Sequence, residues 1–109
     1  MIELVHSTED GIRLTGHGDT PTWVRVLKAQ NGRLPDPDAE WRWVRLDAIT
    51  AVIPHAAIAI GDDRSTWQYV IRIEAGGVDY HPTALHFDHR TVGPAVDKLL
   101  QAVSAALAR

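Results

Sequence analysis

The sequence contains no cysteine, which excludes disulfide bonds, thiol nucleophiles and cysteine-based zinc sites. This absence agrees with a reducing cytoplasm, which is the location that we expect. No apolar run approaches the roughly 20 residues that a membrane-spanning helix needs. The first residues, 1–6, lack the basic start and apolar core of a signal peptide. Membrane insertion and export are therefore not predicted.

Concentrated positive charge is also lacking. The formal net charge is −3, and acidic and basic residues are interspersed along the chain. Neutralisation of phosphates dominates the affinity of most nucleic-acid-binding proteins, which therefore carry a basic patch. The same electrostatic argument disfavours an anionic membrane surface. The sequence therefore predicts neither a nucleic-acid nor a membrane partner. Scarce lysine beside frequent alanine, valine, arginine and aspartate is associated with a GC-rich genome, bacterial or phage.

The length of 109 residues is that of one ordinary domain, and 45% of the residues are hydrophobic. A chain of this size buries a sufficient core without disulfide or metal cross-links. We therefore expect a single domain over residues 1–109. Alternating strand-like runs separated by turn signals predict a mainly β protein. The predicted strands cover residues 2–6, 12–15, 22–28, 41–53, 55–60, 67–74, 78–80 and 84–88.

The longest strand-like run, 41–53, is expected to be the central strand of an antiparallel sheet. Its alternation slips near Asp47, because Val44 and Leu46 have one parity and Ile49 has the other. A β-bulge or sharp bend reconciles the two parities, and so does the end of one strand and the start of another. The residues of this run that we expect in the core are Val44, Leu46, Ile49 and Val52.

Turn and loop signals divide these runs. Asp10-Gly11 predicts the turn of a first hairpin, and Gly76-Gly77 predicts a second turn. Proline lacks the backbone donor of a central ladder, so Pro54 is expected to end the run before it. Connecting loops are predicted at 16–21, 30–40 and 61–66.

The end of the chain predicts one amphipathic helix over about residues 92–108. Thr91 is the expected N-cap, and Pro94 falls in the first turn, where its missing donor costs little. The apolar stripe must cover a face or end of the sheet. The stripe consists of Val92, Val96, Leu99, Leu100, Val103 and Leu107.

The order of these elements resembles pleckstrin-homology-like domains, particularly small bacterial ones. The resemblance rests on a degenerate V-x-L-x-x-I-x-x-V pattern over 44–52, a strand over 67–73, a glycine turn, a strand that ends at 85–88, and the C-terminal helix. It implies a six- to seven-stranded antiparallel bent sheet or roll, capped by the helix at about 92–108. It also implies a binding module, since such domains are usually not enzymes and many of them bind proteins.

Members of that family that bind phosphoinositides use basic residues around the first hairpin loop. Here that loop is 7–11, and it carries Glu9 and Asp10 instead. The departure disfavours phosphoinositide binding, and we carry no lipid-site residue over from the family.

One cluster of residues offers chemistry, near the end of the chain. His86 and Asp88 share one face of a predicted strand, with His81 and His89 nearby. Two imidazoles and a carboxylate form a metal site of the facial-triad type. The alternative is that His86 and Asp88 form the solvated face of an edge strand. No serine lies in a nucleophile-elbow context, so we expect no catalytic residue and no cofactor.

The tryptophans give a second candidate site. If Val24 and Val26 point inward, Trp23 and Arg25 point outward, and the same parity turns Trp41, Trp43 and Arg45 outward when Val44 and Leu46 are core. Tryptophan and arginine are enriched at interface hot spots, and arginine stacks on indole rings. The alternative is a reversed register that buries these tryptophans in the core. The predicted partner-binding residues are Trp23, Arg25, Trp41, Trp43 and Arg45.

The sequence therefore favours a non-enzymatic protein–protein interaction module with a regulatory role. Its partner would be another protein or a second copy of the chain, bound through the aromatic face or an exposed edge strand. Two other functions stay open. One is a small metal-binding protein or metal-assisted enzyme that uses His81, His86, Asp88 and His89. The other is a structural subunit of a larger assembly such as a phage particle.

Overall fold

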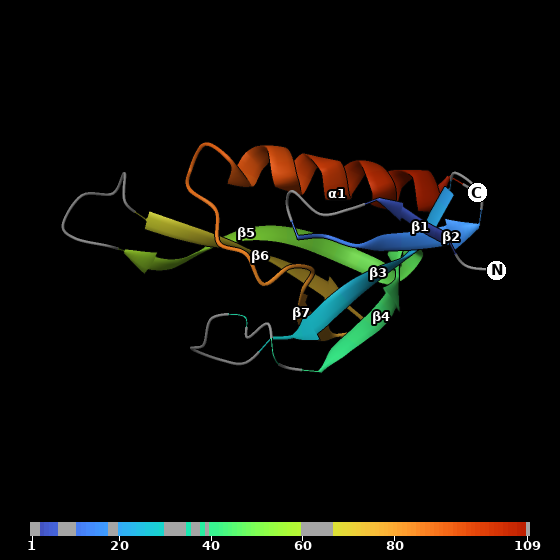
Figure 1. Ribbon diagram of the computed structural model, residues 1–109, viewed down its shortest axis with the longest axis horizontal. Helices are drawn as coiled ribbons and strands as arrows, with labels where there is room; N and C mark the ends of the chain where they lie inside the picture. The colour runs from blue at the N-terminus through green and yellow to red at the C-terminus, as the bar shows by residue number, and fades with distance from the viewer. Residues whose placement is uncertain are drawn as a thin grey trace.

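The computed structural model describes residues 3–6, 11–17, 20–29, 35, 38, 40–59 and 67–108. In this part of the chain, seven antiparallel strands form one curled sheet, and a single C-terminal helix lies along one side of it (Figure 1). The predicted fold class, mainly antiparallel β with one C-terminal helix, is confirmed. No helix in the described ranges is long and apolar enough to cross a membrane.

The sheet has the strand order β1-β2-β3-β7-β6-β5, and β4 pairs with the opposite edge of β3. Strand β3 therefore has neighbours on both of its edges. A short 3-10 helix, η1, joins β4 to β5. The elements are β1 (Glu3–His6), β2 (Leu14–His17), β3 (Thr20–Lys28), β4 (Trp41–Arg45), η1 (Leu46–Ala48), β5 (Ile49–Ala59), β6 (Trp67–Ala75), β7 (Val78–His81) and α1 (Val92–Leu107).

The stretch 41–53 is not one central strand, as the sequence had indicated. The 3-10 helix η1 ends β4 at Arg45, and β5 begins at Ile49. This is the second alternative for the slip near Asp47, in which one strand ends and another starts. Neither strand is central, because β4 pairs only with β3 and β5 only with β6 among the described strands.

Pro54 does not end a strand either, because β5 runs through it to Ala59 and Pro54 lies opposite Ile71 of β6. An edge strand tolerates proline when the missing N–H would have faced away from the ladder. β5 is such an edge among the described strands, so the prediction failed because it assumed a central strand.

Two further predictions about strand ends were wrong. The expected loop at 16–21 is shorter, since Gly16 and His17 belong to β2 and Thr20 and Pro21 belong to β3. Residues 84–88 form no strand; Phe87 makes only an isolated bridge to Tyr69, with N–H···O distances of 2.7 and 2.8 Å. The predicted loop at 61–66, the turn residues 7–10 and most of 30–40 lie outside the described residues.

The glycine turns agree with their prediction. Gly76 and Gly77 have φ angles of 61° and 77° and join β6 to β7. Two positive φ angles in succession match the twist of a tight hairpin, and glycine reaches them without a steric penalty. Gly11 also has a positive φ, 68°, as Asp10-Gly11 had indicated.

The core lies between the helix and the inner face of the sheet, which we define as the face that packs against α1. On β3 it contains Val24 and Val26, both 0% exposed, and on α1 it contains Leu99, 1% exposed. Of the four core residues predicted in 44–52, Leu46 and Ile49 are buried, and Val44 and Val52 pack against the core partly buried. The predicted helix is confirmed, but Leu100 and Leu107 of its stripe are exposed, and Ala95 and Ala102 are buried instead.

Candidate partner-binding face on strands β3 and β4

The alternation of β3 separates two kinds of side chain. Val24 and Val26 enter the core on the inner face, so Trp23 and Arg25 lie on the opposite side of the sheet. Strand β4 continues this outer side. We call the set of Trp23, Arg25, Trp41, Trp43 and Arg45 the Trp/Arg face.

The register between β3 and β4 places each tryptophan beside an arginine. Trp23 lies directly opposite Arg45, and Arg25 lies directly opposite Trp43. Trp41 lies in the next pair on this side of the sheet, opposite Leu27. Residues directly opposite in an antiparallel pair share one face, so the five residues form a single ladder of alternating indole and guanidinium groups.

Two arginine–tryptophan pairs of this ladder form cation–π contacts. The guanidinium carbon of Arg25 lies 3.7 Å from the centre of the Trp41 ring, and that of Arg45 lies 5.9 Å from the centre of the Trp23 ring. A contact of this kind stabilises by about 0.5–1 kcal/mol at exposed sites and more when the pair is shielded from water. The ladder therefore holds its own side chains in place.

Asp47 fixes Arg45 from the other side. Arg45 donates from Nε and from a terminal nitrogen to the two carboxylate oxygens of Asp47, at 3.0 and 2.8 Å. These hydrogen bonds hold the pKa of Asp47 below its ordinary value and raise the pKa of Arg45. Since Asp47 is the middle residue of η1, the turn between β4 and β5 orients the last arginine of the ladder.

Arg25 lies in a different electrostatic environment. Burial lowers the pKa of this guanidinium below its ordinary value, and the charge of nearby Arg13 adds to the effect. Its Nε is buried and has no hydrogen-bond partner in the described part of the molecule. Arg25 is thus held by the Trp41 ring and not by a carboxylate.

Exposure decides between the two sequence hypotheses for these tryptophans. Trp43 is 46% exposed, and Trp23 and Trp41 are half-buried. None of the three belongs to the core cluster under the helix. The orientation on the outer side therefore agrees with the sequence prediction, while the binding role of the face stays a prediction. The side chain of Trp67 lies outside the described residues.

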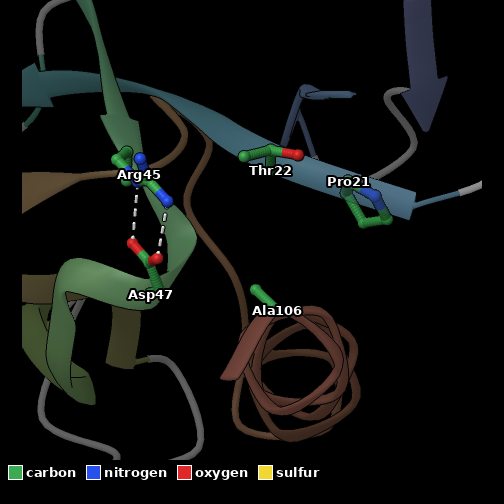
Figure 2. A pocket seen from close by; sticks show the side chains of 5 residues that line it. All are labelled: Pro21, Thr22, Arg45, Asp47 and Ala106. Carbon is green, nitrogen blue, oxygen red and sulfur yellow. Dashed lines mark hydrogen bonds and ion pairs between the residues drawn. The ribbon is translucent and has the colours of Figure 1, made fainter. Parts of the chain in front are cut away.

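A small pocket of about 170 Å³ borders the Trp/Arg face at Arg45. Its walls come from the start of β3, from Arg45 and Asp47, and from the last turn of α1 (Figure 2). Figure 2 shows the Arg45–Asp47 pair on one side of this space and Pro21, Thr22 and Ala106 around the rest. The pocket lies at the Arg45 end of the ladder.

The sequence had not placed His81 beside the Trp/Arg face. His81 of β7 lies opposite Leu27, on the same side of the sheet as Trp41, and both Leu27 and His81 are buried. His81 donates from Nδ1 to the carbonyl oxygen of Ile71 at 2.9 Å, and its buried Nε2 has no partner in the described part of the chain. Burial lowers the pKa of His81 below its ordinary value. Only strand pairing could have revealed this neighbour.

The four residues of the alternative metal-site hypothesis are not brought together. His81 is 2% exposed and already bonded to Ile71, whereas His86, Asp88 and His89 are exposed. The described residues contain no group of three or more histidine, aspartate or glutamate side chains placed to hold a metal ion. The cluster in the sequence is thus not a cluster in space.

Asp88 has a structural task instead. Its Oδ1 accepts hydrogen bonds from the backbone N–H groups of Arg90 and Thr91, at 2.8 and 2.9 Å, and from the Thr91 hydroxyl at 3.1 Å. These bonds hold the pKa of Asp88 below its ordinary value. Thr91 stands at the N-cap position, as predicted, but its side chain makes no capping bond to the helix. The carboxylate of Asp88 organises the turn that starts α1.

Comparison with known proteins identifies no relative. No protein-family model matches the chain, and no curated protein and no solved structure matches it. The resemblance to pleckstrin-homology-like domains therefore stays a prediction.

Proposed function

We propose that this protein is a non-enzymatic interaction module that binds a protein partner through the Trp/Arg face. One observation carries the proposal: Trp43, 46% exposed, stands between two stacked tryptophan–arginine pairs on the outer side of β3 and β4. Large exposed aromatic side chains beside arginine are the residues that dominate binding energy at protein interfaces.

The rigidity of the face supports this function. Trp23 and Trp41 are each in contact with an arginine, and Arg45 is held by Asp47 as well. A partner would therefore immobilise few additional side chains when it covers Trp43, and the entropy cost of association is reduced accordingly. Strands position these residues more firmly than a loop would.

The setting of the module belongs to the same proposal. We infer a pleckstrin-homology-like roll, since seven antiparallel strands precede one C-terminal helix as in that family. We further infer a cytoplasmic location in a bacterial or phage system, supported by the absence of cysteine and the scarcity of lysine. A regulatory role follows if the partner's activity changes when the face is covered.

A photo-crosslinking experiment tests the proposal. A benzophenone-bearing phenylalanine replaces Trp43 in one protein and Leu100 in a second, because Leu100 is a similarly exposed apolar residue on α1, at 42% against 46%. Irradiation in the cytoplasm of the source cell should give a discrete protein adduct from position 43 and none from position 100. Mass spectrometry then identifies the adduct.

The identified protein is purified and its affinity is measured by calorimetry. Trp43→Ala should weaken binding by about tenfold or more, as expected for a hot-spot residue, and Leu100→Ala should leave it unchanged. Equal crosslinking from the two positions, or an unchanged affinity of Trp43→Ala, would contradict the proposed function. An adduct with a second copy of the chain would identify the partner as the protein itself.

A further inference from the structure

Strand β5 forms an edge of the sheet in the described part of the chain, and it contains a proline in its interior. We propose that Pro54 bars a second copy of the chain from pairing along β5. Pro54 thereby decides whether this surface is an interface between copies. The inference concerns a different surface from the Trp/Arg face and does not depend on the proposed function.

The middle of β5 is open to solvent. Ile53, Pro54 and His55 are all exposed, and the exposed fraction of Ile53 is 42%. Among the strands that the structure describes, β5 pairs with β6 alone. A long and exposed edge of this kind presents a row of N–H and C=O groups on which another strand can form.

The side chains of β5 give no electrostatic protection against an added strand. The strand has 11 residues, ITAVIPHAAIA, and contains no aspartate, glutamate, lysine or arginine. Charged side chains, especially lysine, commonly keep the edge strands of two molecules apart. Without them, two copies of β5 bring no like charges together when they pair about a two-fold axis. A second copy is therefore the partner that this neutral, largely apolar edge fits.

Backbone irregularities protect the two ends of β5. The register with β6 shifts between Ile49 and Ala51, and it shifts again between Ala56 and Ile58. Irregularities of this kind bend a strand and disrupt its ladder, which blunts a sheet edge. The regular part of β5 lies between the two shifts and contains Pro54. Protection of this part therefore has to come from the proline.

Hydrogen bonds of β6 show which residues of β5 face the open edge. Tyr69 exchanges both of its backbone bonds with Phe87, at 2.7 and 2.8 Å. The carbonyl oxygen of Ile71 accepts a bond from Nδ1 of His81 in β7, at 2.9 Å, and β7 lies on the other side of β6 from β5. Tyr69 and Ile71 thus direct their backbone groups away from β5. Successive residues of a strand alternate in this respect, so Val70 directs its groups toward β5.

The backbone directions of β5 follow from the strand register. His55 lies opposite Val70, and Ile53 lies opposite Arg72, the next residue of β6 with the same direction. His55 and Ile53 therefore bond to β6. The alternate residues of the regular part turn their backbone groups to the open edge. They are Val52, Pro54 and Ala56, with the proline in the middle.

Proline at the middle position obstructs an added strand. A second copy that pairs antiparallel about a two-fold axis at this position sets Pro54 opposite its own equivalent. Neither proline has an N–H, so both hydrogen bonds of this pair are lost. The ring carbon Cδ also projects from the nitrogen in the direction that an N–H would take, where the carbonyl oxygen of the other strand would have to lie. Any register that covers position 54 meets this obstruction.

Restoring the N–H at position 54 tests the inference on the intact chain. Pro54→Val should self-associate at a concentration about tenfold or more below that of wild type, because the lost hydrogen bonds return and the ring is removed. Sedimentation velocity over a dilution series measures this. The matched control Pro94→Val replaces an exposed proline in the first turn of α1 and should behave as wild type. Unchanged self-association of Pro54→Val would overturn the inference.

Moving the proline along β5 tests whether the direction of the missing N–H is responsible. In Pro54→Val/Ala56→Pro, the proline stands at the next position that faces the edge, so self-association should return to the wild-type level. In Pro54→Val/His55→Pro, the proline removes a bond to β6, so the urea midpoint should fall instead. Persistent self-association of the Ala56→Pro protein would contradict the proposed role. Pro54→Thr restores the same N–H and replaces Pro54→Val if the valine variant does not fold.

Amide hydrogen exchange of the wild type tests the backbone directions without any substitution. The amides of Ile53 and His55 should exchange slowly because they bond to β6, whereas those of Val52 and Ala56 should exchange rapidly because they face water. Equal protection of the four amides in the monomer would overturn the assignment on which the inference depends. Protection of Val52 and Ala56 in a wild-type dimer that is lost on dilution would show that a second copy joins β5 despite Pro54.

Discussion

The two sides of strand β3 are built on different physical principles. On the inner side, Val24 and Val26 are completely buried under the helix. On the outer side, one residue away in sequence, Trp23 and Arg25 belong to a ladder of stacked rings and cations that leaves Trp43 46% exposed. Burial is non-directional and is satisfied by any close packing, whereas the ladder depends on the relative position of specific groups.

This difference predicts that the two sides contribute unequally to stability. The inner side should carry most of the folding free energy, because the apolar area removed from water is concentrated there. The outer side keeps a large aromatic side chain, Trp43, in contact with water and so contributes less to that free energy. Substitutions on the two sides should therefore have effects of different size and kind.

The largest effect is expected from Leu99→Ala on the inner side. Leu99 is 1% exposed in the core, so its truncation should lower the free energy of unfolding by about 2–5 kcal/mol through lost burial and a cavity. Its neighbour Leu100 is 42% exposed, and Leu100→Ala should change stability by no more than about 0.5 kcal/mol. Urea unfolding followed by circular dichroism measures both variants. Similar losses from both variants would show that α1 is packed in another rotation.

The elements of the inner side could be foreseen because hydrophobic periodicity reports them directly. The helix over 92–107 and the buried pair Leu46 and Ile49 follow from the spacing of apolar residues alone. The division of 41–53 into two strands could not be predicted in the same way. A parity slip is compatible with a bulge or with a break, and only tertiary pairing selects the break at η1.

The outer side was predictable in part. The alternation of side chains placed the tryptophans on the other side of the sheet from Val24 and Val26. It could not show which arginine stacks on which ring. Arg25 and Arg45 are far apart in the sequence and come to lie on the same face only through strand pairing. The apparent cluster of His81, His86 and His89 fails for the opposite reason, because nearness in sequence does not fix the direction of a side chain.

The second effect is a dependence of the unfolding free energy on pH, which should originate on the outer side. His81 is buried, and burial together with the nearby charges of Arg72 and His55 lowers its pKa below its ordinary value, although the hydrogen bond to Ile71 and the charge of Asp79 act in the opposite direction. The unfolded chain therefore binds a proton before the folded chain does. The contribution of neutral His81 to the free energy of unfolding should be fully present above the unfolded-state pKa of about 6.5. It should decline as the pH falls below that value.

Chemical unfolding between neutral and mildly acidic pH measures this decline. His81→Gln removes the titrating group and should flatten the dependence of the unfolding free energy on pH in this range. His86→Gln removes an exposed histidine and should leave the wild-type dependence in place. A His81→Gln protein with the full wild-type dependence would show that the decline originates elsewhere in the molecule.

A smaller effect is expected from the ladder itself. Arg25→Ala removes the guanidinium group that lies 3.7 Å from the centre of the Trp41 ring. The free energy of unfolding should fall by about 0.5–2 kcal/mol, since the pair is partly shielded from water. Arg42→Ala removes an exposed arginine from the neighbouring strand and should change it by no more than about 0.5 kcal/mol.

A double-mutant cycle shows whether the contact itself is responsible. Arg25→Ala and Trp41→Ala are combined, and unfolding free energies of the four proteins are compared. A coupling of about 0.5–1 kcal/mol is expected for a cation–π pair at a partly exposed site. Additive losses would mean that Arg25 and Trp41 stabilise the fold independently and that the ladder is not a unit.

The smallest effect on stability should come from Trp43, the residue on which the proposed function depends. Because Trp43 is 46% exposed and lies outside the core, Trp43→Phe should leave the unfolding free energy within about 0.5 kcal/mol of wild type. Its fluorescence provides a second readout. The emission lost in Trp43→Phe should lie at longer wavelength and be quenched more strongly by acrylamide than the emission lost in Trp41→Phe, since Trp41 is stacked under Arg25. A blue-shifted, quencher-resistant contribution from Trp43 would place this indole in the protein interior. The two sides of β3 would then no longer differ in the way that the partner-binding role requires.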